Sequence, residues 1–168
     1  MATPNERLVY AAKTDSAEMM QEVLNGTEHF DVNWQDGLGN TALHYAAASP
    51  SPSALEILLE YDGTDVDLQN RLDRSTPLHM AVKLENEAAR QGVIEMLLDA
   101  GADTSIKDRH SLRLQDYLRP QSSSIDAEIL QSIREAQAER ARGSVSNNAD
   151  IADESDGEPG SGSGSDEE

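Results

Sequence analysis

Histidine is the residue type in this chain with the most versatile chemistry, because a neutral imidazole can act as a general base or bind a metal ion. The sequence has four histidines, and two of them, His44 and His79, stand in nearly the same surroundings. The segment TALHYAA at 41–47 recurs 35 residues later as TPLHMAV at 76–82. A histidine that recurs with its neighbours at a fixed interval is typical of a repeated structural unit rather than of a single active site.

Other residue patterns that would support catalysis are absent from the sequence. The motifs GxxxxGK[ST], GxSxG and HExxH do not occur. The chain has no cysteine, which excludes disulfide bonds, thiolate metal sites and cysteine nucleophiles. The glycines of GSGSGS at 160–165 have no strand pattern before them and no helix pattern after them, so we interpret this segment as linker. We therefore expect no enzymatic activity, no cofactor and no bound metal.

The histidine motifs belong to a longer pattern, which predicts the elements that position them. Each motif is followed by an apolar cluster with helical spacing, ALEILL at 54–59 and VIEMLL at 93–98. Short extended pieces recur as DVNWQD at 31–36, DVDLQN at 65–70 and DTSIKD at 103–108. Weaker copies of the first helix occur as LVYAA at 8–12 and LQDYL at 114–118. The chain thus contains about four units of helix, turn, helix and extended finger.

Residues that begin and end helices occupy consistent places in these units. Thr41 and Thr76 stand where helix N-caps are expected, and Pro77 follows at a first helical position. Glycines after the second helices are expected at left-handed C′ positions: Gly26, Gly63 and Gly101. Polar residues of the fingers recur at unit spacing, which predicts Asx turns that bind local N–H groups. These residues are Asp31, Asp65 and Asp103, and then Asp36, Asn70 and Asp108.

The runs TALHYAA, TPLHMAV and LLDAGADTSIKD resemble the ankyrin repeat, over residues 5–120 and loosely to 142. The resemblance implies an all-α solenoid with β-hairpin-like fingers and units at about 5–35, 36–70, 71–108 and 109–142. It also implies structural roles for Thr41, His44, Thr76 and His79, with each imidazole bonded to its own turn and to the neighbouring finger. Stacked repeats lie about one helix diameter, ~10 Å, apart, so two equivalent histidines do not converge on one metal ion.

The C-terminal part of the chain departs from the repeat pattern. In the fourth unit, Leu112 and Arg113 stand at the threonine and proline positions and Gln115 at the histidine position, as suits a cap. We expect a C-terminal helix over 126–142, whose first half closes the stack. Residues 143–168 are rich in Gly, Ser, Asp and Glu, and we expect them to be disordered because they cannot bury enough apolar area.

The resemblance also implies where a partner protein binds, namely on the finger tips and the exposed side of the first helices. The positions that correspond are Trp34, Gln35, Leu38, Asn40, Gln69, Arg71, Leu72, Arg74, Lys83, Lys107, Arg109 and His110. Trp34, the only tryptophan, has two interpretations. It packs on the base of its finger, as the aligned Leu68 would, or it anchors a partner, since Trp is enriched among binding hot spots.

The charge of the chain indicates the chemistry of its partner. The formal net charge is −19, and acids dominate the first seventy residues and the tail, whereas the second and third finger tips are basic. A chain of this charge repels nucleic acid and anionic membranes, so we expect its partner to be a protein with a basic surface. We expect the chain itself to be a monomer. No apolar run is long enough to span a membrane, and we expect a cytoplasmic or nuclear protein.

Two functional hypotheses follow from these observations. The first is an escort or chaperone for a basic client, such as a ribosomal protein or a histone. The second is an adaptor or regulatory subunit, in which the acidic tail only increases solubility. A further hypothesis concerns the tail itself, which could cover the basic finger tips until a partner arrives.

Overall fold

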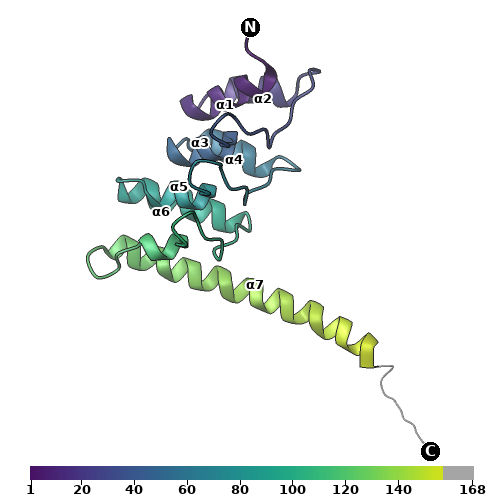
Figure 1. Cartoon of the computed structure of the whole chain (residues 1–168), viewed down its shortest axis with the longest axis vertical. Coiled ribbons are helices and arrows are strands. Elements are labelled where there is room, and N and C mark those ends of the chain that lie inside the picture. Colours follow the sequence, from purple (N-terminus) through teal and green to yellow (C-terminus); the bar gives the residue numbers. More distant parts are fainter. Residues whose placement is uncertain (157–168) are drawn as a thin grey trace, which may run out of the picture. The chain divides into compact units, whose positions relative to one another are not determined.

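The computed structural model describes the backbone of residues 1–156 and the side chains of residues 1–143 (Figure 1). Over these residues every regular element is helical, and no strand is present. The elements are α1 (Pro4–Thr14), α2 (Ala17–Leu24), α3 (Ala42–Ala48), α4 (Pro52–Glu60), α5 (Pro77–Val82), α6 (Glu87–Asp99), the 3-10 helix η1 (Leu114–Tyr117) and α7 (Ser124–Asp156). The first compact part of the chain, Met1–Ile133, contains the whole repeat stack.

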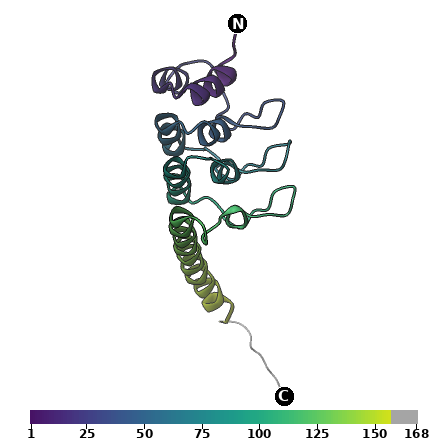
Figure 2. The same ribbon diagram turned by 90° about the vertical axis from the view of Figure 1, so that its left-hand side faces the viewer.

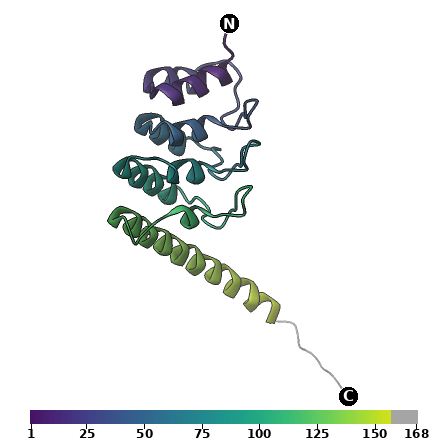
Figure 3. The same ribbon diagram turned by 60° about the vertical axis from the view of Figure 1, so that its left-hand side comes forward.

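Within this first part the helices pair and then stack in two rows. Figure 2 shows α1, α3 and α5 in an inner row, α2, α4 and α6 in an outer row, and the fingers beyond the inner row. Neighbours along the rows are in contact: α1 with α3, α3 with α5, α2 with α4 and α4 with α6. The fingers of successive units project on the same side of the stack (Figure 3). The predicted all-α solenoid of helix-turn-helix units is therefore confirmed.

Small side chains on the inner helices allow the rows to pack closely. Alanines of α1, α3 and α5 have no exposed surface: Ala11, Ala12, Ala46, Ala47 and Ala81. Leucine, isoleucine and methionine side chains of both rows fill the space between helices: Leu8, Met20, Leu43, Leu55, Leu58, Leu78, Ile94 and Leu97. Burial of each such side chain contributes roughly 1.5–3 kcal/mol to the stability of the fold. Because these side chains come from all three helix pairs, the core extends along the whole stack.

The helix caps agree with the sequence pattern at most positions. The hydroxyls of Thr41 and Thr76 accept hydrogen bonds from the N–H groups of His44 and His79, which makes both threonines N-caps. Gly63 and Gly101 have φ of 95° and 87°, so their left-handed conformation is confirmed. The prediction for Gly26 is wrong, because φ is positive at neither Gly26 nor its neighbours.

The geometry after α2 explains this difference. The C-cap of α2, Asn25, has φ of −98° and ψ of 0°, a right-handed conformation that directs the chain onward without a left-handed residue. A Cβ at Gly26 would lie 2.8 Å from the carbonyl oxygen of Glu22. Glycine is therefore needed at this position for close backbone approach and not for positive φ.

The fourth unit begins one residue later than the sequence pattern indicates. Arg113 is the N-cap of η1, and the carboxylate of Asp116 at N3 accepts the N–H of Arg113 at 2.8 Å. Asp116 therefore occupies the place that His44 and His79 hold in the central units, and the assignment of Gln115 to that place is wrong. The short 3-10 turn, which replaces a full α-helix here, removes the periodicity on which the assignment depended.

The C-terminal helix is longer than predicted, since α7 extends from Ser124 to Asp156. Ile129 and Ile133 near its start are fully buried in the first compact part, so this segment closes the stack as expected. The disorder expected for 143–168 falls on residues whose side chains, and from 157 also the backbone, lie outside the described part of the chain. No described helix combines the length and the apolar character that crossing a membrane requires.

Candidate protein-binding surfaces

Each finger is held in shape by one polar side chain at the start of its tip. The Oδ1 atom of Asp36 accepts the N–H groups of Leu38 and Asn40 at 2.9 and 3.0 Å. In the second finger, Asn70 accepts the N–H groups of Asp73 and Ser75. In the third, Asp108 accepts those of His110 and Leu112. The predicted Asx turns are therefore confirmed at Asp36 and Asp108. Asn70 closes its longer tip differently, since its side chain accepts from residues three and five positions on. The three side chains make each tip a closed hairpin-like loop, although no strand ladder forms among the described residues.

A second set of Asx turns joins the bases of the fingers. Asp31, Asp65 and Asp103 each accept the N–H of the residue two positions on, at 2.9 Å. The N–H of Asp65 in turn donates to the side chain of Asn33 at 2.8 Å, and that of Asp103 donates to Asp67 at 2.8 Å. These finger carboxylates are therefore occupied by the backbone, and their recurrence is structural.

Backbone hydrogen bonds also join the finger tips to one another. The carbonyl oxygen of Leu38 accepts the N–H groups of Arg71 and Leu72 at 2.9 and 3.2 Å, and that of Asp73 accepts the N–H of Arg109 at 2.8 Å. Gly39, with φ of 82°, makes the first of these contacts possible, because a Cβ there would lie 2.3 Å from the nitrogen of Arg71. The three tips thus form one continuous, backbone-linked surface.

Three of the predicted partner-binding residues form hydrogen bonds between fingers, and one of the three is buried. Asn40 is only 4% exposed and accepts a hydrogen bond from the amide of Asn70 at 2.9 Å, so the prediction of a partner contact there is wrong. The amide of Gln35 donates to the carbonyls of Gly39 and Gln69, and the amide of Gln69 donates to those of Arg74 and Lys107. These residues link neighbouring fingers, because side-chain amides can replace missing strand hydrogen bonds.

The exposed remainder of the predicted set is amphipathic. Leu38 and Leu72 are 48% and 54% exposed, unusual values for large apolar side chains. Arg71, Arg74, Lys107, Arg109 and His110 are exposed beside them. We call this set the tip ridge: Leu38, Arg71, Leu72, Arg74, Lys107, Arg109 and His110.

Trp34 lies at the base of its finger and not on the tip ridge. Its side chain is half-buried and packs against the hydrophobic core of the stack. This placement favours the first interpretation of Trp34, in which the indole supports the finger.

The inner helices present a row of tyrosines toward the fingers. The hydroxyl of Tyr45 donates to Asp36 and that of Tyr117 donates to Asp108. Burial and the Asp108 hydrogen bond raise the pKa of Tyr117 to about 12. Burial alone would raise the pKa of Asp36, but hydrogen bonds from Tyr45, Asn40 and Leu38 outweigh it and lower the pKa of that carboxyl.

Each of these two tyrosine rings has a lysine ammonium group close to it. The Lys13 ammonium lies 4.3 Å from the ring centroid of Tyr45, and that of Lys83 lies 5.3 Å from the ring of Tyr117. Lys83 also pairs with Asp73 at 3.5 Å. Most of the charged groups named here, between the fingers and the inner helices, therefore have a partner of opposite charge or an aromatic ring beside them.

His44 and His79 lie within the stack, as the resemblance implies. The Nε2 atoms bond the carbonyl oxygens of Ser75 and Leu112 in the following units, each at 2.9 Å. Both side chains are at most 1% exposed. No group of three or more metal-binding side chains occurs among the described residues.

Two of the outer helices, α2 and α4, carry only acidic charged side chains. The sequences of α2 and α4 contain no lysine or arginine. Their carboxylates, with Asp62 just after α4, are all exposed and form what we call the outer acidic face: Glu18, Glu22, Glu56, Glu60 and Asp62. One of them, Glu22, pairs with Arg7 of α1 at 3.2 Å. The one base of α6, Arg90, has an 11% exposed side chain paired with Asp126 at 2.7 Å. The exposed charge of α2 and α4 is thus acidic, whereas the exposed charge of the second and third finger tips is mainly basic.

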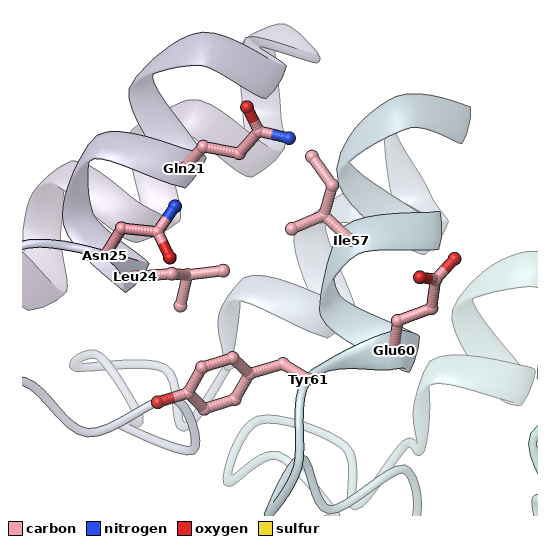
Figure 4. A pocket seen from close by; sticks show the side chains of 6 residues that line it. All are labelled: Gln21, Leu24, Asn25, Ile57, Glu60 and Tyr61. Atoms are coloured by element: carbon pink, nitrogen blue, oxygen red, sulfur yellow. The ribbon is translucent and has the colours of Figure 1, made fainter.

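A shallow open groove of about 250 Å³ lies on this face between α2 and α4 (Figure 4). Its lining combines apolar and polar side chains: Gln21, Leu24, Asn25, Ile57, Glu60 and Tyr61. It lies on the second helices, whereas the partner-binding residues predicted from the sequence lie on the fingers and first helices. The periodic sequence pattern gave no signal for the groove, because its two walls come from different units.

Stacked helix pairs with linked fingers and a threonine–histidine joint in each central unit define a repeat protein of the ankyrin class. The chain belongs to the ankyrin repeat family, since the family model "Ankyrin repeats (3 copies)" matches residues 8–108. Ankyrin repeats are a non-catalytic fold that binds other proteins, and this chain is accordingly a protein-interaction module.

Similar proteins include relatives of very different size. The Ankyrin repeat-containing protein YGL242C of Saccharomyces cerevisiae is 28% identical over 159 residues, which cover 89% of this chain and 87% of that protein. Neurogenic locus notch homolog protein 1 is 33% identical in Xenopus laevis and 38% in Mus musculus, each over 106 residues. Those matches cover 63% of this chain but only 4% of the Notch proteins.

Proposed function

We propose that this chain is an escort protein that binds a basic client protein on its outer acidic face. The observation that carries the proposal is the acidic exposed charge of α2 and α4. Helices α2 and α4 expose Glu18, Glu56 and Glu60 and contain no lysine or arginine. Four exposed lysines and arginines lie instead at the second and third finger tips. A surface with charge of one sign attracts an oppositely charged partner and accelerates its association.

The groove between α2 and α4 supplies a place where such a client is anchored. Charge alone gives weak and poorly oriented binding in physiological salt, since exposed pairs contribute about 1 kcal/mol or less. Leu24 and Ile57 contribute apolar side chains to the lining of the groove, while Glu60 contributes a carboxylate and Tyr61 a hydroxyl (Figure 4). A client segment that places an apolar side chain among lysines or arginines fits this combination.

The adaptor hypothesis remains the alternative, and it predicts a different response to salt. An interface with an apolar core depends little on ionic strength, whereas attraction to exposed carboxylates is screened over about 10 Å at 0.1 M salt. The acidic surface also supports a protein rather than a nucleic acid or anionic membrane as the partner. A cytoplasmic or nuclear location and a monomeric state belong to the same proposal.

The test uses a fluorescent synthetic peptide of lysine and leucine as the basic probe and measures its fluorescence anisotropy with the full chain. We expect binding that weakens at least about tenfold between ~50 and ~300 mM salt. The double substitution Glu56→Gln/Glu60→Gln is expected to weaken binding at low salt. The control Glu85→Gln/Glu139→Gln changes the net charge equally, but both residues lie outside α2 and α4. Equal binding by both variants would contradict the proposal, as would binding that does not respond to salt.

A further inference from the structure

The tip ridge contains the most exposed leucines of the described chain. Leu38 and Leu72 occupy equivalent places in adjacent fingers, each two residues after the side chain that closes its tip. Neither leucine supports the finger that carries it, because each tip is held by that side chain and by the backbone bonds between fingers. Exposed apolar side chains that recur at one edge of a stack are typical of a contact surface.

The backbone holds these leucines in a fixed relation. The Leu38 carbonyl accepts the N–H of Leu72 itself, so the two residues are joined directly across the fingers. Binding to a surface that is already ordered avoids the loss of conformational entropy that a flexible loop would suffer. The tips are therefore suited to bind an extended segment that crosses from finger to finger.

The arginines of the ridge form no ion pair within 4.0 Å among the described residues. Arg7, Lys83, Arg90 and Arg113 all have a carboxylate within 4.0 Å. By contrast, Arg71, Arg74 and Arg109 form no such ion pair among residues 1–143. Asp73 lies in the same finger as two of these arginines, but it pairs with Lys83.

Arg74 has a left-handed backbone conformation, which is uncommon for a residue other than glycine. Its φ of 57° places it in the left-handed region, where its counterpart in the first finger is Gly39 with φ of 82°. Glycine would adopt this conformation without the penalty of about 1 kcal/mol that a residue with a Cβ incurs. Ser111 holds the same place in the third finger with φ of 62°, so the left-handed conformation belongs to all three tips, and at Arg74 a long cationic side chain is projected from it.

We propose that the tip ridge binds an acidic segment of a partner protein in which apolar side chains alternate with carboxylates. The leucines accept the apolar side chains, and Arg71 and Arg109 each accept a carboxylate, for which the planar guanidinium offers paired donors. The proposal goes beyond the basic client of the outer acidic face, because it uses a different layer and a partner of opposite charge. The chain would then join a basic protein to an acidic one.

The experiment measures binding of two fluorescent synthetic peptides to the full chain. The first alternates glutamate with leucine, and the second has serine in place of leucine. We expect the first to bind roughly tenfold more tightly or better, since buried apolar contacts dominate small interfaces. Leu38→Ser/Leu72→Ser should abolish this difference, and Arg71→Gln/Arg109→Gln should weaken both peptides. Equal binding of the two peptides to the unmodified chain would overturn the proposal.

Two further variants separate binding from folding and from the function proposed above. Arg74→Gly favours the native turn, so weaker peptide binding by this variant cannot be due to unfolding. Glu56→Gln/Glu60→Gln lies on the outer acidic face and should leave binding of the acidic peptides intact. Loss of binding in that variant, or no loss in Arg74→Gly, would contradict the assignment to the ridge.

The chain's own residues 150–168 are also acidic and are the competing occupant. A carbodiimide, which joins carboxylates to amines, tests this on the full chain because Lys107 is the one lysine of the ridge. Cross-links from Lys107 to carboxylates of 150–168 within one molecule would show self-occupancy and overturn the proposal of a separate partner. We expect Lys107 to cross-link instead to the glutamate–leucine peptide.

Discussion

The Nε2 atom of His44 donates to the main-chain carbonyl oxygen of Ser75 at 2.9 Å, and so connects one repeat to the next. The other ring nitrogen, Nδ1, accepts the N–H of Thr41 at 3.1 Å. An imidazole with one accepting and one donating nitrogen is neutral, so both bonds together fix its tautomer. The residue that offered the most chemistry in the sequence is thus fully engaged in joining repeats.

We predict that His44→Ala lowers the free energy of unfolding by about 2–4 kcal/mol, because a buried N–H and a buried carbonyl lose their partner. Thermal denaturation followed by circular dichroism checks this. His29→Ala is the control, since that histidine is exposed. The peptide binding described above should be unchanged in both variants below their melting temperatures. A stable His44→Ala protein that no longer binds would contradict the structural role.

The same joint predicts how stability depends on pH. Burial lowers the pKa of His44 below its ordinary value of 6.5, and hydrogen bonds to backbone groups only partly oppose this. Because the unfolded chain then binds a proton more readily than the folded one, stability falls as pH decreases from 6.5 toward the folded pKa. Urea denaturation at pH 7.5 and pH 5.5 measures the effect. In His44→Gln the dependence should be weaker, and an identical dependence would contradict the assignment.

Three glycines give a graded prediction for the fingers. Gly39→Ala forces a Cβ to within 2.3 Å of the Arg71 nitrogen and should destabilise by about 2 kcal/mol or more. Gly63 has a positive φ but open space around it, so Gly63→Ala should lower the free energy of unfolding by about 1 kcal/mol. Gly37→Ala has neither constraint and should be neutral. Chemical denaturation of the three variants checks this order, and equal stability of Gly39→Ala and Gly37→Ala would refute the close approach.

The ion pair between Arg90 and Asp126 predicts a weak point at the end of the stack. The two side chains are 11% and 9% exposed, and Asp126 also accepts the N–H of Arg119 at 2.8 Å. Asp126→Asn removes the nearer and more buried of the two carboxylates beside Arg90 and leaves only Glu87 at 3.5 Å, which should destabilise by about 3 kcal/mol. Hydrogen exchange should then increase first over 124–133. Glu128→Gln is the exposed control, and equal exchange in both variants would count against the role of this pair.

The sequence predicted the local features of the fold well because they depend on short-range chemistry. Thr41, Thr76, Asp36 and Asp108 bind N–H groups only a few residues away, so their types and spacing reveal their roles. The fourth unit was misplaced by one residue because Asp116 replaces the histidine in a short 3-10 turn.

The candidate sites were harder to predict because they depend on neighbours in other units. Asn40 resembles an exposed finger residue in sequence, but Asn70 of the next finger covers it and bonds to it. The groove between α2 and α4 combines Leu24 with Ile57, which lie far apart in the chain. The sequence indicated the basic finger tips, but only the stacked helices show that the carboxylates of α2 and α4 lie together on the outer row.

The central claim is that a basic client binds the outer acidic face, and mapping its contact on the isotope-labelled full chain by NMR tests this most directly. Titration with the lysine–leucine peptide should shift the amide signals of the groove residues Gln21, Leu24, Ile57 and Tyr61. The signals of the tip ridge, including Leu38 and Leu72, should remain unchanged. Shifts confined to the tip ridge, or spread evenly over the whole stack, would contradict the account.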